Sequence, residues 1–277
     1  MTAPVIPAPL PALEFEVPLV NPAPGGLFSV TSWTEVTGPS RFLGEGVRIH
    51  TKNYGAEQSA GVWDAGWCGD PGDQRKEGER PENLDSFAPV TVWAVDSCDL
   101  TAPSQQEVRE RAAQNLRLLE QTAVERELSE RLLIDGSPGH AGVLSLVDAV
   151  AHLEKLFAET NTVGLIHASA GLASYAMKDN LVTRSGAALK TPMGHTWVFG
   201  GGYVDGLVAS AGEPVLVGTS SPCYGWRSPV EVREAIDATH NTFIAIAERS
   251  LVVSYEYCVG AATVIDMTPA PAADALR

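Results

Sequence analysis

The clearest change of pattern along the chain is from a strand-like period to a long helical period near residue 100. Residues 87–95 are rich in β-branched and aromatic side chains, which predicts a strand. Beyond the turn that follows, apolar residues recur every three to five positions, as on one face of a helix. They are Val108, Ala112, Leu116, Leu119, Ala123, Leu128 and Leu132. Ser104 and Glu107 have the spacing of a capping box and Gly136 marks an end, so we expect one helix over residues 104–133.

Shorter apolar runs surround this helix and predict a mixed α+β chain. Helices are expected over residues 144–160, 171–177 and 230–238, and strands over 28–33, 46–50, 162–168, 196–199, 214–218, 242–247, 251–258 and 262–266. A turn at 248–250 is expected to separate two of the last strands. The long helix would reach about 45 Å at 1.5 Å per residue, which suits a spine across which other elements lie.

The first 26 residues combine dense proline with apolar side chains. Proline at this density excludes a helix or a central strand and favours extended chain. A disordered tail is one interpretation, but such tails are mostly polar, whereas this segment is rich in Val, Ile, Leu and Phe. An extended arm that lies in a groove of a neighbouring subunit fits the apolar content better.

A second segment, residues 69–85, is charged and rich in glycine and proline, so it cannot bury itself. It predicts a long exposed loop. Such a loop suits a subunit that reaches onto its neighbour, and it equally suits an ordinary mobile loop.

Charge and composition exclude several classes of function. The net charge is −15 and no basic stripe exists, which argues against direct nucleic-acid binding because phosphate contacts need clustered Lys and Arg. The four cysteines, Cys68, Cys98, Cys223 and Cys258, are too far apart in sequence to suggest a zinc site or a disulfide framework. No apolar run reaches 18 residues and no secretory signal is evident, so we expect a protein made in a cytoplasm and not inserted in a membrane.

Candidate catalytic motifs are weak. Ser169 lies between an expected strand and helix, as in a nucleophile elbow, but His167 stands where that motif needs glycine. Ser169 is better interpreted as a helix N-cap. The triplet at residues 200–202 lacks both the dinucleotide-binding glycine spacing and a Walker lysine, and we expect a turn there.

The remaining polar residues favour structure over chemistry. Asp96 and Asp99 flank Cys98 and could in principle do acid–base work, but Asp99 fits a turn that leads into the helix. Two i,i+4 pairs, Glu107 with Arg111 and Glu127 with Arg131, are expected on a solvated helix face. The histidines, His50, His140, His152, His167, His195 and His240, lack metal-binding spacing. The tryptophans, Trp33, Trp63, Trp67, Trp93, Trp197 and Trp226, are expected to anchor core or subunit contacts.

The order of these elements resembles the HK97-type major capsid protein of tailed bacteriophages, whose fold is shared with encapsulin shells. Residues 163–169 and 239–249 look like stretches in capsid-type proteins of phages that infect actinobacteria. The resemblance implies an N-terminal arm over 1–27, an E-loop region over 28–86 and a P-domain with the spine helix over 87–143. It further implies an A-domain over 144–238, then returning P-domain strands and a C-terminal tail over 239–277.

The chain departs from this family in two respects. It has no evident N-terminal coiled-coil scaffolding segment, which implies a separate scaffolding protein or none, and no Lys–Asn crosslinking pair can be assigned.

The resemblance implies a structural subunit, not an enzyme, that self-assembles through hexamers and pentamers into the icosahedral capsid of a virion in the host cytoplasm. The shell would enclose DNA without sequence-specific binding, with a portal and a decoration protein as further partners. No catalytic, cofactor-binding or metal-binding residue is expected. The alternatives are an encapsulin-like compartment, a minor head protein and, from another class, an α/β hydrolase-type enzyme that uses Ser169 or an aspartate at the strand ends.

Overall fold

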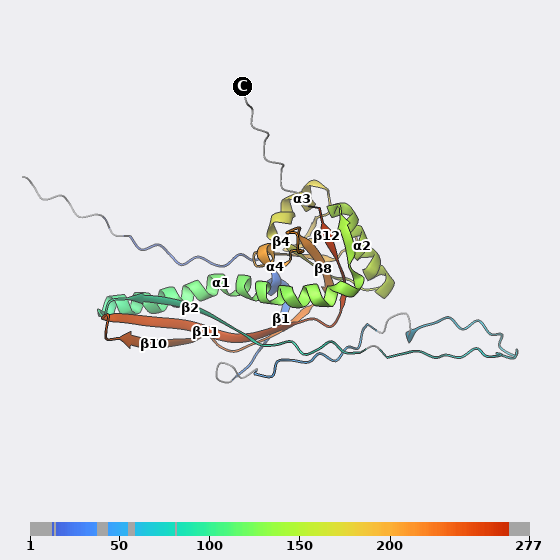
Figure 1. The fold of residues 1–277 in the computed structure, drawn as a ribbon, viewed down its shortest axis with the longest axis horizontal. Coiled ribbons are helices and arrows are strands. Elements are labelled where there is room, and N and C mark those ends of the chain that lie inside the picture. The colour runs from blue at the N-terminus through green and yellow to red at the C-terminus, as the bar shows by residue number, and fades with distance from the viewer. Residues whose placement is uncertain (1–12, 14, 38–43, 55–58, 81, 266–277) are drawn as a thin grey trace, which may run out of the picture.

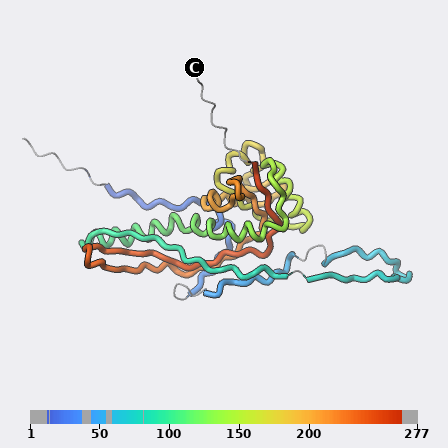
Figure 2. The backbone as a smooth tube through the Cα atoms, in the orientation of Figure 1, coloured from blue at the N-terminus to red at the C-terminus, as the bar shows by residue number. Residues whose placement is uncertain are grey.

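The computed structural model describes residues 13, 15–37, 44–54, 59–80 and 82–265. One long helix lies between two β-sheets, and a thin excursion of extended chain projects away from this body (Figure 1). The tube view shows the excursion, defined here as the described residues 44–54, 59–80 and 82–86, as two segments that run out and back side by side (Figure 2). None of the helices in these described ranges is long and apolar enough to cross a membrane.

The first sheet is long and narrow, and we call it the elongated sheet. Its strands are β1 (Thr31–Glu35), β2 (Val90–Cys98), β9 (Cys223–Arg227), β10 (Glu231–Asp237) and β11 (Thr242–Ser254). Strand β11 is the centre, since it pairs antiparallel with β2, β9 and β10, while β1 runs parallel to β9. Strand β11 pairs with β2 from Phe243, opposite Cys98, to Leu251, opposite Val90. Alternate residues of both strands therefore face the long helix.

That helix, α1 (Ala102–Gly136), confirms the predicted spine. Its start differs from the prediction, because Thr101 is the N-cap and Pro103 lies in the first turn, where its missing N–H costs nothing. Ser104 is therefore inside the helix, and its hydroxyl accepts a hydrogen bond from Thr101 at 2.9 Å instead of forming a capping box.

The apolar face of α1 is confirmed at most of the predicted positions. Val108, Ala112, Leu116, Leu128 and Leu132 are buried in the first core, which α1 forms with the elongated sheet. Leu119 was predicted on the same face, and this is wrong: its side chain is 60 % exposed. The buried positions 112, 116, 120, 124 and 128 recur every four residues, and position 119 lies 100° around the helix from position 120.

The second sheet has seven strands in the order β3-β12-β8-β4-β7-β6-β5. Their bounds are β3 (Ala141–Leu144), β4 (Gly164–Ser169), β5 (Thr183–Ser185), β6 (Ala188–Lys190), β7 (Thr196–Gly200), β8 (Val215–Ser220) and β12 (Cys258–Val264). The amphipathic helix α2 (Leu146–Thr160) packs on this sheet and closes a second core around Phe157. Shorter helices complete the chain: η1 (Leu27–Val30), η3 (Ser137–Gly139), η4 (Ala170–Leu172), α3 (Ala173–Lys178) and α4 (Tyr203–Gly206).

Five predicted elements need correction. Residues 230–238 form strand β10 and not a helix, because residues 231–237 pair along their whole length with β11, and Arg109 of α1 binds Glu234. Residues 242–254 form one strand without a turn at 248–250. At the N-terminal side, the strand expected over 28–33 begins only at Thr31, and within 46–50 only Val47 pairs, with Phe87. The last strand begins at Cys258, and position 266 lies outside the described residues.

The middle of the second sheet holds a buried histidine. His167 contacts the Tyr203 hydroxyl through Nδ1 at 2.9 Å and the Thr219 hydroxyl through Nε2 at 2.8 Å. Complete burial lowers the pKa of His167 from 6.5 to about 3. The unfolded chain therefore binds a proton at His167 below pH 6.5, whereas the folded chain does not until the pH is near 3. The free energy of unfolding therefore falls as the pH falls from 6.5 towards 3.

We expect His167→Gln, which keeps a donor and an acceptor but does not titrate, to flatten this loss. Between pH 7 and pH 5 the free energy of unfolding of the parent should fall by about 2 kcal/mol more than that of the variant. The reason is that pH 5 lies about 1.5 units below the ordinary histidine pKa of 6.5, and each unit corresponds to about 1.36 kcal/mol. Urea unfolding at the two pH values measures the difference. Equal losses in parent and variant would show that another group carries the acid sensitivity.

Candidate assembly surfaces

The described N-terminal segment lies extended along α1, held by polar side chains one helical turn apart. Gln114 donates to the Val20 carbonyl at 2.7 Å, Arg117 binds the Asn21 side chain, and Gln121 donates to the Gly25 carbonyl at 2.9 Å. Positions 114, 117 and 121 lie on one face of the helix, because their spacings are three and four. This face of α1 therefore binds the N-terminal segment in an extended conformation, mostly through the backbone of that segment.

Glu125 continues the same face and fixes the end of the segment. Its carboxylate is fully buried and accepts the Leu27 N–H at 2.9 Å and the Gly202 N–H at 2.9 Å. Burial raises the pKa of Glu125, and these backbone donors oppose the rise. A single carboxylate thus joins η1, α1 and the turn before α4. Glycine is required at position 202, because a Cβ there would lie 2.2 Å from the Thr122 carbonyl oxygen.

The apolar side chains ahead of this anchor are open to solvent. Leu13, Phe15, Val17, Leu19 and Val20 are all exposed, although the chain that carries them is held at Val20 and Asn21. A row of exposed apolar side chains next to this anchored point is a surface suited to a partner. The arm prediction also covers residues 1–12 and 14, which lie outside the described residues, and contact with a neighbouring subunit stays a prediction.

The root of the excursion is bound firmly to the body. Glu256 accepts hydrogen bonds from the backbone N–H groups of Lys52 and Asn53 at 2.6 and 2.8 Å and from the Asn53 amide at 2.7 Å. Burial raises the pKa of Glu256, but these donors outweigh it and hold the pKa below its usual value. Tyr54 stacks on Tyr257, with ring centroids 4.8 Å apart.

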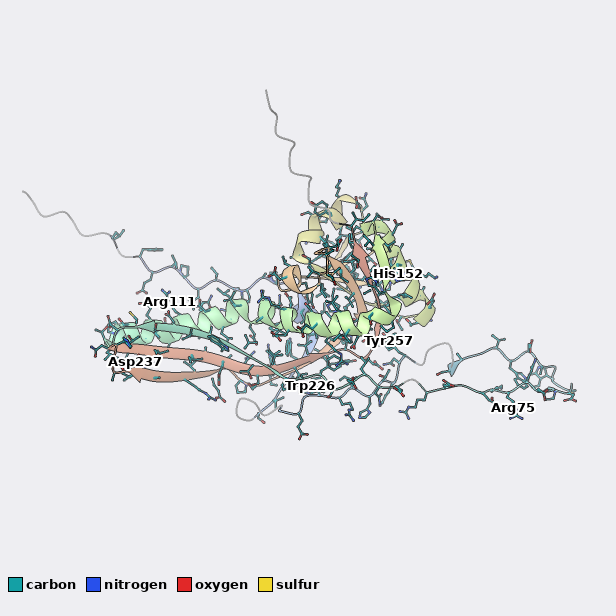
Figure 3. The ribbon with its side chains drawn as sticks, viewed as in Figure 1. Arg75, Arg111, His152, Trp226, Asp237 and Tyr257 are labelled. Carbon is teal, nitrogen blue, oxygen red and sulfur yellow. The ribbon has the colours of Figure 1, made fainter. Side chains whose placement is uncertain are left out.

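Beyond Tyr54 the described excursion leaves the body. The part that we call the tip, residues 59–80, is held by bonds between its own two sides, from Ser59 to the Glu79 carbonyl at 2.6 Å and from Gln74 to Asp64 at 2.8 Å. Arg75 marks its position at the far end of the excursion (Figure 3). The prediction of an exposed loop over 69–85 is confirmed, since nearly every described residue there is exposed.

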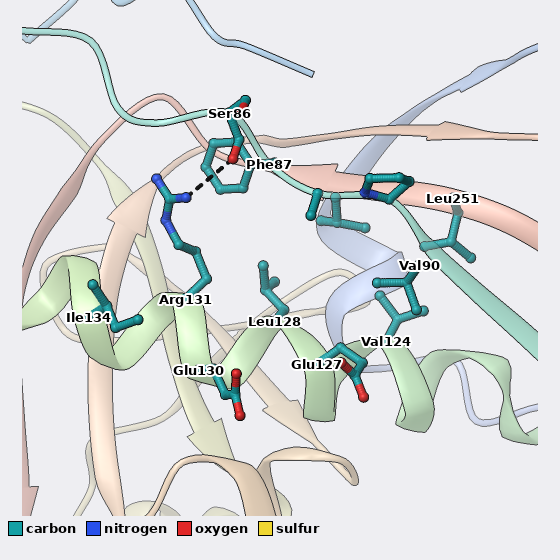
Figure 4. Close-up of a pocket in the computed structure, with 13 residues that line it drawn as sticks. Ser86, Phe87, Val90, Val124, Glu127, Leu128, Glu130, Arg131, Ile134 and Leu251 are labelled. Carbon is teal, nitrogen blue, oxygen red and sulfur yellow. Dashed lines mark hydrogen bonds between the residues drawn. The ribbon is translucent and has the colours of Figure 1, made fainter. Parts of the chain in front are cut away.

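A groove of about 350 Å³ lies where the returning excursion passes α1 (Figure 4). It is lined by Ser86, Phe87, Ala88, Pro89, Val90, Val124, Glu127, Leu128, Glu130, Arg131, Ile134, Leu251 and Val253. Arg131 closes one end of it: the guanidinium binds Asp135 at 2.7 Å, donates to the carbonyls of Asp85 and Ser86, and lies 4.6 Å from the centre of the Phe87 ring.

The residues considered for catalysis have structural partners. The Ser169 hydroxyl accepts the Gly171 N–H at 3.3 Å, so the N-cap prediction is confirmed. Asp96 pairs with Arg111 at 2.9 Å, and Asp99 accepts the Thr101 N–H at 2.8 Å in the predicted turn. The turn predicted at residues 200–202 leads into the short helix α4.

The histidines are spread over the molecule. His167 is buried in the second sheet, and His195 is stacked on Phe157 with centroids 4.2 Å apart. His140 contacts Thr263, His152 contacts the Gly139 carbonyl, and the exposed His240 pairs with Asp237. Within the described ranges, no three residues of the types His, Cys, Asp and Glu gather closely enough to hold a metal ion.

Of the two predicted i,i+4 pairs, Glu107 with Arg111 is confirmed at 3.5 Å, whereas Arg131 pairs with Asp135 rather than with Glu127. The tryptophans were expected to anchor core or subunit contacts, and their role in subunit contacts stays a prediction. Trp197 is buried, and Trp33 lies under the Arg227 guanidinium, 4.8 Å from ring to cation. Trp63, Trp67 and Trp93 are exposed.

Glu125 and Glu256 are the residues that position both extending segments, and sequence reasoning missed them. One feature of the sequence could have identified Glu125. It lies between Val124 and Leu128 in the apolar period of α1, and a carboxylate on the buried side of a helix needs hydrogen-bond donors. Glu256 lies between two tyrosines after a strand, and no periodicity distinguishes it.

Comparison with known proteins gives structural matches alone, since the sequence matches no protein-family model and no curated protein. The capsid of an empty GTA particle is 13 % identical, with a TM-score of 0.56 over 92 % of this chain and 94 % of that chain. The capsid of a native GTA particle is 10 % identical, with a TM-score of 0.56 over the same shares. The mature capsid of bacteriophage PhiM1 is 10 % identical, with a TM-score of 0.51 over 95 % of this chain and 93 % of that one.

The chain therefore has the fold of these capsid proteins over nearly its whole length, and the predicted HK97-type α+β fold is confirmed. More than nine-tenths of each chain is aligned in these matches. At identities of 10–13 % these structural matches establish the fold alone. The function has to be argued from the surfaces of this chain.

Proposed function

We propose that this protein is the shell-forming subunit of a tailed-phage capsid and that it has no catalytic activity. The single observation that carries the proposal is the excursion. Its root is clamped by Glu256, and its tip is extended, exposed and remote from the body. Ordering a long segment of exposed chain costs about 1–2 kcal/mol per residue, which an isolated monomer does not recover. Contacts with neighbouring copies recover it.

The other surfaces support the same proposal. The arm presents a row of exposed apolar side chains, and the acidic character of the chain opposes adhesion to packed DNA. Repetition of such contacts by symmetry closes a shell from a single kind of subunit. The sequence resemblance to proteins of phages that infect actinobacteria supports a phage of this kind as the source of the protein. Assembly in the host cytoplasm, with a scaffolding protein and a portal as partners, is part of the same proposal.

The division into arm, E-loop region, P-domain and A-domain is also a proposal. Strands β9 and β10 hydrogen bond within the elongated sheet, so we limit the proposed A-domain to the part of 144–238 that precedes Cys223 and assign the strands after it to the P-domain.

Expression of the full chain alone, followed by size exclusion and negative-stain imaging, tests the proposal. Closed shells are expected. A stable small oligomer with a measurable hydrolytic activity would favour the enzyme class instead.

Ser169→Ala separates these two classes. We expect unchanged shell yield and shape and a loss of about 1 kcal/mol in the free energy of unfolding, because only an N-cap hydrogen bond is removed. Thermal unfolding and particle counts measure both quantities. A hydrolytic activity in the parent that Ser169→Ala abolishes would refute the non-enzymatic interpretation.

A further inference from the structure

Two short connections between the sheets are tied together by one serine. The chain passes from β8 to β9 through residues 221–222, and from β11 to β12 through residues 255–257, which we call the crossing. Ser220 is buried at the end of β8, and its hydroxyl accepts the N–H groups of Glu256 and Tyr257 at 2.9 and 3.1 Å. Its own N–H donates to the Tyr257 carbonyl at 2.8 Å. The crossing is therefore fixed to the second sheet.

Each residue of the crossing also holds the root of the excursion. On the outgoing side, Glu256 accepts two backbone N–H groups and one side-chain amide, and Tyr257 stacks on Tyr54. On the returning side, Tyr255 meets the Phe87 ring edge-on, with ring centroids 5.0 Å apart. Tyr54, Phe87 and Tyr255 are buried, so these contacts are shielded from water. The segment that holds both sides of the excursion is thus the segment that joins the two sheets.

The excursion is a long lever on this small root. Tyr257 lies beside the root, whereas Arg75 lies at the far end of the excursion (Figure 3). At a reach of about 3.3 Å per residue, the chain from position 54 to position 67 can span about 40 Å, and a rotation of about 5° at the crossing then moves the tip by about 3–4 Å. A small displacement of the second sheet would therefore be enlarged at the tip.

We propose that the crossing is a joint that couples the direction of the excursion to the position of the second sheet, with Glu256 as the positioning residue on the excursion side and Ser220 on the sheet side. When the second sheet moves relative to α1, the crossing moves with it and swings the tip. Coupling between two parts needs an element that both contact, and the crossing is such an element. The proposal concerns a single chain and goes beyond the proposed shell function without depending on it.

A wedge between α4 and α1 displaces the second sheet without touching the excursion. Helix α4 leads into β8, and Figure 1 shows it across α1 from the excursion. A Cβ at position 206 would lie 2.1 Å from the Ser129 hydroxyl oxygen on α1, so Gly206→Ala forces the two helices apart. Ser129→Thr adds a methyl group at the same contact and keeps the hydroxyl, and it is the alternative wedge if Gly206→Ala does not fold.

Spin labels measure the response within one chain. One label is placed on Cys68, which is exposed in the tip, and the other on a thiol introduced by Glu130→Cys at an exposed position of α1. Cys98→Ser removes the other exposed thiol, and the remaining two cysteines are buried. Excess unlabelled chain ensures that only distances within a chain are recorded. We expect Gly206→Ala to shift the mean distance between the labels by about 3–4 Å, as the lever implies, with an unchanged circular dichroism spectrum.

Glu256→Ala should remove this shift and broaden the distance distribution, because the root then loses its hydrogen bonds to the crossing. Asn83→Ala is the matched control. It breaks the 2.9 Å hydrogen bond from the Thr51 N–H inside the excursion and leaves the crossing intact, so the shift should remain. A shift that persists in Glu256→Ala, a shift that Asn83→Ala also removes, or no shift in a folded wedge variant would each overturn the joint.

Discussion

Leu116→Asp is expected to abolish folding, whereas Leu119→Asp, less than one turn further along α1, is expected to leave a folded protein. Leu116 is 1 % exposed in the core between α1 and the elongated sheet, and Leu119 is 60 % exposed. An unpaired carboxylate at position 116 would lose the apolar contacts and bury a charge, which costs at least about 4 kcal/mol and is a large part of the stability of a typical domain.

Circular dichroism and urea unfolding of the soluble fraction measure this difference, with Leu119→Asp as the matched control because it introduces the same charge on the same helix. We expect a change of about 0.5 kcal/mol or less in the control. A folded Leu116→Asp protein, or an unfolded Leu119→Asp protein, would show that the register of α1 on the sheet is wrong.

Deletion of residues 1–24 is expected to abolish closed shells and to leave the subunit folded. The described residues that it removes are exposed, and the anchor at Leu27, which Glu125 holds, remains. The cut is placed before Gly25 because its carbonyl accepts from Gln121, and because Gly26, with φ of +84°, sets the turn into η1. The far-ultraviolet circular dichroism spectrum should be unchanged, while the yield of particles in electron micrographs should fall at least tenfold.

A full-length variant with Phe15, Val17 and Leu19 changed to serine separates side-chain contact from simple loss of chain. These residues are exposed, so the fold has no need of them, and we expect the same loss of shells. Normal particles from both variants would mean that the N-terminal segment is a tail with no part in assembly.

Periodicity predicted the elements that are regular and amphipathic, and it failed where polar side chains are paired within the fold. The spine helix and α2 follow from their apolar stripes. The sequence of β10 was interpreted as a helix, and what makes it a strand is its pairing with β11 along residues 231–237, with Glu234 bound by Arg109 of α1. The charged residues in the middle of β11 suggested a turn, but Glu248 pairs with Arg233 and Arg249 pairs with Glu120 across neighbouring elements. Such partners are distant in sequence.

The candidate surfaces were predictable only in outline. Proline density and apolar content indicated an extended arm, and charge with glycine indicated an exposed excursion. The residues that fix them in place, Glu125 and Glu256, act by accepting backbone N–H groups from segments 98 and about 200 residues away. No local pattern encodes such a contact, because the donor is main chain and is the same for every residue type except proline.

Cryo-electron microscopy of the full-length chain, purified after expression alone, tests the central claim most directly. The account predicts closed icosahedral particles whose reconstruction shows the excursion and the N-terminal segment of each subunit in contact with neighbouring copies. A uniform population of monomers or small oligomers, with these two segments free of contact, would contradict it.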